Sequence, residues 1–344
     1  MTGETTNLFD LTRERMEAFT APVDDKPYRT HQIMKWAYHQ RQLDFSGMTN
    51  LSKAFRDWLT EHAVYRLPEV VTRRESVDGT VKWVVRVGNG NCVETVLIPE
   101  RGRNTLCVSS QVGCAVGCVF CMTGREGLKQ QVSSAEIVAQ IALARQQHTV
   151  RRVVFMGMGE PAHNLDNVMN AIELLGSVGD IGHKNLVFST VGDARVFERL
   201  PRGPVKPALA LSLHSTDAER RAKLLPRAPR FDPAELVELG ERYARATGYP
   251  MQVQWTLLAG VNDGDDELDG IVALLRGKHA ILNMIPYNHV DGLGHRRPDA
   301  ARCTAIFRQL NQRGVLTRMR QSAGQEVDGG CGQLRARVIA LHPA

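Results

Sequence analysis

The chain has 344 residues, which is enough for one large hydrophobic core and a smaller module. It is 43% hydrophobic and 23% charged, a composition typical of globular proteins. Lysine and arginine total 43 against 37 acidic residues, so the net charge of +6 suits RNA as a partner without establishing one. The sequence contains no run of 18 apolar residues and no basic, apolar start, so we expect neither a membrane span nor a secretory signal.

Residues 1–65 are predicted to form a small helical accessory domain. Apolar side chains recur there at helical spacing in two stretches: Ile33, Trp36 and Ala37, then Leu51, Phe55, Trp58 and Leu59. Residues 66–104 are expected to form a β-hairpin linker segment. Two β-rich runs, 83–87 and 93–98, flank the turn sequence Gly-Asn-Gly-Asn at 88–91 in that segment.

From residue 105 to residue 344, short apolar runs alternate with amphipathic helices. The expected strands are 105–109, 153–156, 186–189, 208–213, 253–258, 281–285 and 316–319. Two helix starts are also predicted: Ser133 with Glu136 forms a capping box, and Asp232 before Pro233 is an N-cap. This alternation predicts a parallel α/β domain, either a barrel or a doubly wound sheet.

The chain has seven cysteines, and Cys114, Cys118 and Cys121 are spaced C-x3-C-x2-C. Three thiolates can hold three irons of a cubane iron–sulfur cluster and leave the fourth iron open to a ligand. The alternative is a structural zinc site, which needs four ligands in paired spacing. His148 and Cys107 are candidates for that fourth ligand, although neither has a usual spacing. The odd cysteine count argues against a disulfide framework and indicates a cytoplasmic location.

Polar residues gather where several predicted strands end. The motifs are Gly157-Met-Gly-Glu-Pro161, Ser189-Thr190, Ser212-Leu-His214 and Pro286-Tyr-Asn288. In parallel barrels the chemistry sits at the carboxyl-terminal rim of the strands, so these motifs and the cysteine triplet predict a single site. Taken alone, a histidine such as His214 is more often a structural residue than a ligand.

The cysteine triplet followed by Gly-Glu-Pro, Ser-Leu-His and Pro-Tyr-Asn resembles the radical S-adenosylmethionine superfamily. The chain also resembles the RlmN/Cfr family of RNA adenine methyltransferases from about residue 28 to residue 340. The stretches that carry this resemblance are 32–38, 48–53, 93–96, 105–111, 155–161, 260–263 and 330–334. This resemblance implies a partial (β/α) barrel of the radical S-adenosylmethionine type over residues 105–344. It also implies that the helical domain binds RNA and that a C-terminal loop carries a catalytic cysteine.

The resemblance implies cofactors as well. Cys114, Cys118 and Cys121 would hold a [4Fe–4S] cluster, and two molecules of S-adenosylmethionine would be consumed per turnover. The residues expected to bind S-adenosylmethionine are Gly159, Glu160, Ser189, Ser212, Leu213, His214 and Asn288. A carboxylate such as Glu160 suits an α-ammonium group, the alternative being a charge at a helix N-terminus. The electron donor would be a flavodoxin or a ferredoxin, and the enzyme is expected to be a monomer.

Three further residues match catalytic positions of the family. Cys331 would carry the methyl group that a 5′-deoxyadenosyl radical activates for addition to the adenine ring. Glu94 would be the general base that removes the ring proton, and Cys107 would capture Cys331 as a disulfide and release the product. Without the resemblance, Cys107 and Cys331 would be interpreted as small buried residues, the interpretation kept for Cys92 and Cys303.

The implied reaction is methylation of carbon 2 of an adenine in 23S ribosomal RNA, with transfer RNA as a further candidate substrate. Gly-Glu-Pro at 159–161 favours carbon 2, whereas Ser-Leu-His-Ser at 212–215 favours the Cfr-like alternative, carbon 8. A non-catalytic, zinc-binding RNA-binding protein is the alternative from another class. The chain departs from the family pattern at Met122, at 224–231, at Gln254-Trp255 and at His289, all expected near the cofactor and substrate walls.

Overall fold

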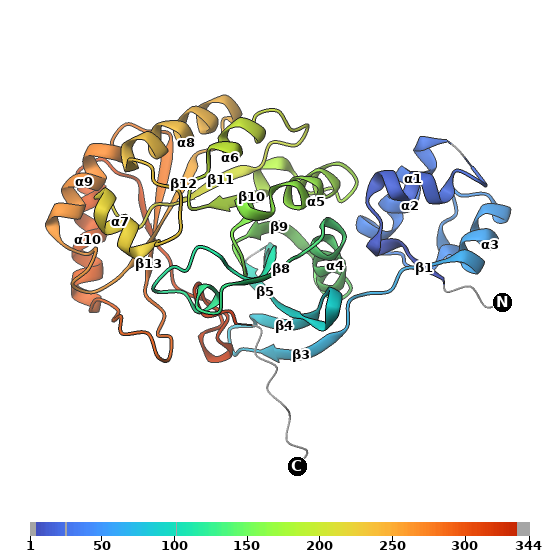
Figure 1. The fold of residues 1–344 in the computed structure, drawn as a ribbon, viewed down its shortest axis with the longest axis horizontal. Helices are drawn as coiled ribbons and strands as arrows, with labels where there is room; N and C mark the ends of the chain where they lie inside the picture. Colours follow the sequence, from blue (N-terminus) through green and yellow to red (C-terminus); the bar gives the residue numbers. More distant parts are fainter. Residues whose placement is uncertain (1–4, 25, 101, 336–344) are drawn as a thin grey trace, which may run out of the picture.

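The computed structural model describes residues 5–24, 26–100 and 102–335. Its N-terminal part is a helical module that stands beside the main domain, on the side of α4 and α5 (Figure 1). The module consists of β1 (Thr6–Asn7), α1 (Arg13–Thr20), α2 (Pro27–Tyr38), α3 (Lys53–His62) and β2 (Ala63–Val64). The predicted helices are therefore present. The parallel β1–β2 pair was not predicted, because two-residue strands carry no periodic pattern.

The main domain is built on one ten-stranded sheet of order β14-β13-β12-β11-β10-β9-β6-β5-β4-β3. Each of the predicted apolar runs overlaps one of its parallel strands: β6 (Arg103–Cys107), β9 (Val150–Phe155), β10 (Leu186–Thr190), β11 (Ala208–Ser212), β12 (Met251–Leu257), β13 (Ala280–Pro286) and β14 (Thr317–Met319). These strands follow one another across the sheet in chain order. A doubly wound sheet would reverse direction at a switch point, so the sheet is an open barrel.

An antiparallel extension continues the same sheet beyond β6. It comprises β3 (Val70–Glu75), β4 (Val81–Arg86) and β5 (Cys92–Glu100). The predicted hairpin is confirmed, with Val85 opposite Val93 across the turn. The strand β3 was missed at the sequence level because most of its side chains are exposed or half-buried and show no apolar alternation. Because β5 pairs with β6, the extension forms one wall of the barrel rather than a separate flap.

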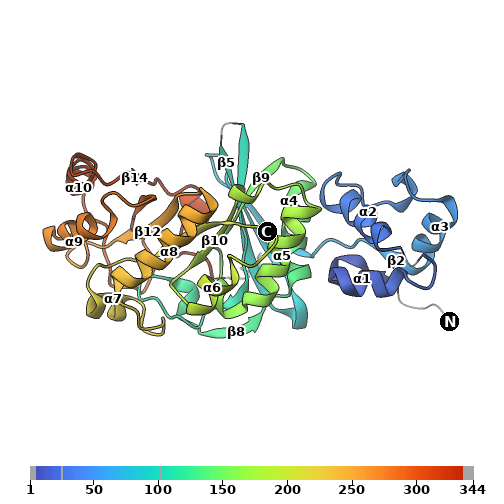
Figure 2. The ribbon, with the colours of Figure 1, turned by 90° about the horizontal axis from the view of Figure 1, so that it is seen from above.

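Helices cover the outer face of the curved sheet (Figures 1 and 2). They are α4 (Ser134–Arg145), α5 (Leu165–Ser177), α6 (Ala194–Arg199), α7 (Ala218–Leu224), α8 (Pro233–Thr247), α9 (Asp265–Leu275) and α10 (Ala300–Gln312). Both predicted starts are confirmed: Ser133 and Glu136 form a capping box on α4, and the Asp232 side chain caps α8. Since the helices bury the outer face, the strand ends and the inner face are left for the site.

The N-terminal module contacts the barrel through α4. The buried Arg145 side chain donates hydrogen bonds to the carbonyl of Tyr38, at the end of α2, and to the carbonyl of Gly179, at 2.8 Å. Burial lowers the pKa of Arg145 to about 10, so the guanidinium stays charged at neutral pH. In the part of the chain described here, no helix is both long and apolar enough to cross a membrane.

Candidate active site

The cysteine triplet lies on a loop between two short antiparallel strands, β7 (Gln111–Gly113) and β8 (Leu128–Gln131). The backbone N–H of Cys114 donates to the carbonyl of Gly127 at 3.1 Å, which closes the loop. Gly113 has φ +75°, and a Cβ there would lie 1.9 Å from the Gly127 carbonyl oxygen. Only glycine fits this close approach, so the residue before Cys114 is dictated by the loop.

The three thiols lie close enough together to perturb one another. Burial raises the pKa of Cys114 to about 12. Burial also raises the pKa of Cys118 well above its usual range, and the charges of Cys121 and Cys114 raise it further. A cationic iron–sulfur core would remove this repulsion and favour the three thiolates. The residues present therefore fit a cluster.

The same residues do not fit a structural zinc site. Within residues 5–24, 26–100 and 102–335, no three His, Cys, Asp or Glu side chains converge on one metal ion. Structural zinc needs four ligands directed at a single point, whereas the thiolates of a cubane each bind a different iron. Of the two candidate fourth ligands, His148 packs its ring against Trp83, with ring centroids 6.0 Å apart, and Cys107 lines a second cavity that Cys121 also lines.

A cavity of about 890 Å³, including its open mouth, extends from the triplet along the ends of the barrel strands. We call it the triplet cavity. Its wall brings together most of the predicted residues: Cys114, Cys118, Cys121, Gly159, Glu160, Ser189, Ser212, His214 and Cys331. Its size suits a small-molecule ligand. Residues from β9, β10 and β11 thus meet the cysteine loop at one end of the barrel, as the strand-end motifs predicted.

Glu160 has one of the two roles that the sequence left open, that of a charge at a helix N-terminus. It is the N-cap of the short 3-10 helix Pro161–Asn164, and its carboxylate accepts from the N–H groups of Ala162 at 3.2 Å and Val191 at 3.1 Å. Burial raises its pKa to about 7, although hydrogen bonds, including one from Thr190, oppose the shift. A cation bound against this carboxylate would favour its charged form.

His214 lies in the cavity wall in a neutral form. Burial and the nearby Arg221 lower its pKa to about 3. Its Nδ1 accepts a hydrogen bond of 3.0 Å from the Thr256 N–H, so the ring proton is on Nε2. The residue has φ +62°, a left-handed conformation that costs energy in a non-glycine residue.

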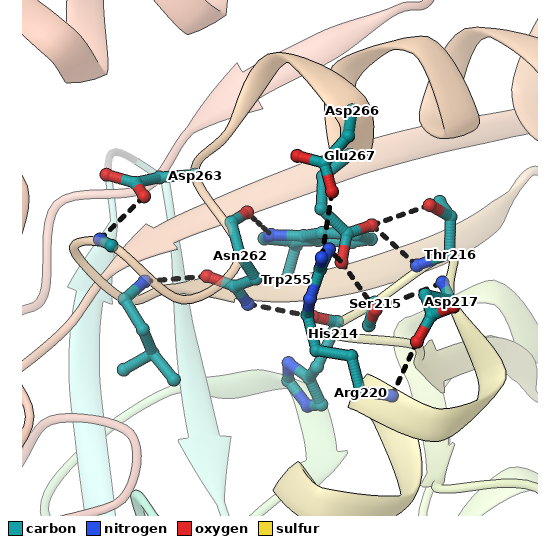
Figure 3. Close-up of polar contacts among 12 residues, drawn as sticks. His214, Ser215, Thr216, Asp217, Arg220, Trp255, Asn262, Asp263, Asp266 and Glu267 are labelled. Atoms are coloured by element: carbon teal, nitrogen blue, oxygen red, sulfur yellow. Dashed lines mark hydrogen bonds and ion pairs between the residues drawn. The ribbon is translucent and has the colours of Figure 1, made fainter.

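A buried polar network holds this strained backbone in place (Figure 3). The Asn262 amide donates to the carbonyls of His214 at 2.7 Å and Thr256 at 2.8 Å, and its oxygen accepts from the Leu258 N–H at 2.8 Å. The next residues after His214 are anchored by the buried Glu267 carboxylate, which accepts from the Thr216 N–H at 2.7 Å. Asn262 lies in the stretch 260–263, which the sequence analysis singled out without giving the residue a role.

Two predicted cofactor residues do not lie in the wall of the triplet cavity. The Leu213 side chain is fully buried in the barrel core, and its N–H donates to the Gln254 carbonyl at 3.2 Å. The Asn288 amide instead donates to the Cys331 carbonyl at 3.1 Å. In this structure Asn288 therefore fixes the loop that carries Cys331.

A second cavity, of about 1100 Å³ including its opening, continues into the barrel. We call it the Cys107 cavity. It is lined on one side by Cys107 and Thr105 of β6 and on another by Gln252 of β12. Cys121 and Cys331 line both cavities, so the Cys331 loop borders the space of the cysteine triplet and that of Cys107.

Cys107 is half-buried and Cys331 is exposed, and both thiols are free. Burial raises the pKa of the Cys107 thiol, and the nearby Cys331 sulfur raises it further. The thiol therefore stays protonated at neutral pH, which slows its oxidation. Cys92 and Cys303 are buried and free, in agreement with their interpretation as packed residues.

Glu94 lies outside the walls of both cavities. It is almost fully buried on β5, beside the end of the Cys331 loop, where its Oε2 accepts from the Arg335 N–H at 3.2 Å. Burial raises its pKa, and the charge of Lys82 lowers it. The structure thus brings Glu94 to the loop that carries Cys331 but not into the space where Cys107 and Cys331 meet.

The departures from the family pattern fall in different places. Gln254 lines both cavities and is the one departure exposed to both. Its neighbour Trp255 points away into the core, and its indole N–H donates to the Asn262 carbonyl at 3.3 Å. His289 is an exposed partner of Asp291, at 3.3 Å. Sequence reasoning missed Thr256 and Met156 in the triplet cavity, although both follow the strand-end rule that identified their neighbours.

A cysteine triplet at the rim of an open parallel barrel, facing a cavity that ends at a buried carboxylate, defines a radical S-adenosylmethionine enzyme. Comparison with known proteins supports this assignment. Residues 6–65 match the model described as the ribosomal RNA large subunit methyltransferase N-terminal domain, and residues 108–272 match the radical SAM superfamily. The fold superimposes on a radical SAM methyltransferase from Sphaerobacter thermophilus with a TM-score of 0.87 and 36% identity, covering 96% of this chain and 100% of that one.

Curated relatives extend the match over nearly the whole chain. A protein from Azoarcus sp. named "Probable RNA methyltransferase azo0122" is 56% identical over 342 residues, which is 96% of this chain and 95% of the relative. A "Probable RNA methyltransferase" from Leptothrix cholodnii is 68% identical over 263 residues, or 76% of this chain and 75% of the relative. The chain belongs to the RlmN family of radical S-adenosylmethionine RNA methyltransferases.

Proposed function

We propose that this enzyme methylates carbon 2 of an adenine in 23S ribosomal RNA through a methylated Cys331 and a covalent protein–RNA adduct. Transfer RNA is proposed as a second substrate. The observation that carries the proposal is the position of Cys331, which faces the cysteine triplet in one cavity and Cys107 in the other. A residue that must first accept a methyl group and later form a disulfide needs access to both places.

The cofactor chemistry is assigned to the triplet cavity. Cys114, Cys118 and Cys121 would hold the [4Fe–4S] cluster, which when bound supplies the electron that cleaves S-adenosylmethionine to a 5′-deoxyadenosyl radical. The buried Glu160 carboxylate suits the α-ammonium group of S-adenosylmethionine, since a cation there relieves the cost of its burial. The neutral His214 offers an Nε2–H donor from the same wall. A flavodoxin or a ferredoxin is proposed as the electron donor.

Release of the product is assigned to three residues of the chain. The radical adduct loses one electron, which the cluster would take back when bound, and Glu94 takes the proton from its ring carbon. The Cys107 thiol loses its proton as it attacks the Cys331 sulfur, and a disulfide forms as the bond between that sulfur and the methylene carbon breaks. The electron pair of the broken bond leaves with the carbon, which takes up a proton and becomes the methyl group. The shared cavity of the two thiols supports this step.

The position of methylation can be tested on the product. Ribosomal RNA from a deletion strain, incubated with the purified enzyme, should gain 2-methyladenine, because Gly159-Glu160-Pro161 is the sequence associated with carbon 2. Mass spectrometry of the nucleosides against synthetic 2-methyl and 8-methyl standards distinguishes the two. Formation of 8-methyladenosine would instead identify the Cfr-like reaction, and an unmodified RNA would contradict the methyltransferase assignment for this substrate. Transfer RNA treated in parallel tests the second substrate.

The N-terminal module is proposed to hold the RNA. Its Tyr28 is 50% exposed, with the Arg29 guanidinium 4.9 Å from the ring centroid. Exposed aromatic rings and arginine planes are typical stacking partners for unpaired bases. Replacing Tyr28 by alanine should weaken RNA binding roughly tenfold in a filter-binding assay, because the variant loses the binding free energy of one stacking contact. Thermal stability should not change; unaltered affinity would place the RNA elsewhere.

A further inference from the structure

Lys82 is a buried lysine in the wall of the barrel. It lies on β4, is 7% exposed, and its Nζ is 3.4 Å from Oε1 of Glu94 on the neighbouring strand β5. A buried ammonium group is costly unless it is paired. Within the described residues, the charged groups that act on Glu94 are Lys82 on β4 and Arg335 in the Cys331 loop. Lys82 is therefore the side-chain partner of the proposed general base.

Lys82 also contacts the start of the Cys331 loop. Its Nζ donates to the carbonyl of Asp328 at 3.3 Å, while the other oxygen of Glu94 accepts from the N–H of Arg335 at the far end of the loop. The two loop ends are joined to each other by an ion pair between Arg335 and Asp328, at 3.8 Å. Lys82 and Glu94 thus form hydrogen bonds to both ends of the segment 328–335, which carries Cys331 at its centre.

The turn between β3 and β4 holds the chain just before this loop. The Asp78 carboxylate accepts from the Gly324 N–H at 2.9 Å, and the Ser76 hydroxyl donates to Glu326 at 3.1 Å. These contacts anchor the same C-terminal segment without touching Glu94. The antiparallel extension therefore offers two kinds of anchor, one made only by the β3–β4 turn and one made by the Lys82–Glu94 pair.

We propose that Lys82 is a positioning residue for product release: it orients the Glu94 carboxylate and ties it to the loop that presents Cys331. The inference rests on the proposed role of Glu94 as the general base. Burial in this wall favours the protonated, inactive form of the carboxyl group, and Lys82 opposes that effect. Without Lys82, burial is opposed only by Arg335, so the pKa of Glu94 rises and a higher pH is needed before the group can accept a proton.

The experiment compares four variants of the reconstituted holoenzyme: Lys82→Met, Lys82→Arg, Glu94→Gln and Asp78→Asn. Methyl loading of Cys331 is measured by mass spectrometry, and decay of the protein–RNA adduct is followed on denaturing gels between pH 6 and pH 9. Lys82→Met should load methyl and form adduct, but release it more slowly, with the largest loss at the acid end of this range, up to roughly tenfold for each unit by which the pKa rises, and with the rate recovering as the pH increases. Lys82→Arg should restore the wild-type pH profile.

Asp78→Asn is the matched structural control. It removes a charged acceptor at Gly324 and should lower thermal stability while leaving the pH profile of release unchanged. Two results for Lys82→Met would show that the inference is wrong. One is release of product at the wild-type rate. The other is release slowed equally at every pH, which is the effect expected if the substitution only loosens the segment. If Lys82→Met folds poorly, Lys82→Arg still tests the inference, because a pH profile of release that differs from the wild-type profile would contradict it. Normal release by Glu94→Gln would instead refute the base role itself.

Discussion

Replacing Cys118 by alanine should give a protein that binds little iron and forms no 5′-deoxyadenosine. Each of the three thiolates binds a different iron of a cubane, so one missing ligand opens a second iron and destabilises the cluster. The fold should survive. The loop remains held by hydrogen bonds from the Met122 N–H to the Gly332 carbonyl at 2.8 Å and from the Arg227 N–H to the Val116 carbonyl at 3.1 Å.

Anaerobic reconstitution followed by iron analysis is the measurement. Wild-type protein should be brown and hold about four irons per chain. Cys303→Ala is a suitable control, because Cys303 is also a free cysteine but is buried on α10, outside both cavities. It should retain full iron and full radical formation. A Cys118→Ala protein with wild-type iron content and turnover would contradict the assignment of the triplet as cluster ligands.

The strands and helix starts that could be predicted from the sequence share a property. Their signals are local: an apolar run such as the one at 153–156, or a cap such as Ser133 with Glu136, acts within a few residues. The strand β3 could not be predicted because it lies at the sheet edge, where its side chains stay exposed or half-buried and show no apolar alternation. The choice between a barrel and a doubly wound sheet likewise depends on strand order, which local patterns do not contain.

The site was predictable where it follows strand ends and not where it depends on contacts across the chain. Motifs at the ends of β9, β10 and β11 led to Glu160, Ser189 and Ser212, which the structure brings into one cavity. The contact between Asn288 and the Cys331 carbonyl joins residues 43 positions apart. The pairing of Lys82 with Glu94 depends on the register of β4 and β5, and its link to Asp328 spans 246 positions. Rules based on the spacing of residues in the sequence cannot predict such pairs.

Replacing Cys107 by alanine should stop turnover at the covalent adduct. The variant retains the triplet, Glu160 and Cys331, so it should still load a methyl group on Cys331, cleave S-adenosylmethionine and attack the base. Release then fails, because Cys121, the other cysteine that lines the Cys107 cavity with Cys331, would be bound to the cluster and could not take the Cys331 sulfur. RNA should accumulate joined to protein as a slowly migrating band on a denaturing gel, while product formation falls by on the order of 10³-fold or more, a loss typical of removing a residue on which turnover depends.

The competing interpretation is that Cys107 is a packed thiol, since it contacts the apolar cluster of Val154, Val187 and Ala210 inside the barrel. In that case alanine leaves a small void and costs roughly 1 kcal/mol of stability, with turnover preserved. The matched variants separate the two. Cys92→Ala removes a buried thiol on the neighbouring strand β5 and should turn over normally. A chain lacking both Cys107 and Cys331 should show no band, because the adduct needs the Cys331 sulfur. Multiple turnover by Cys107→Ala without a cross-link would exclude the two-cysteine release mechanism in this protein, even though its cavity brings the two thiols together.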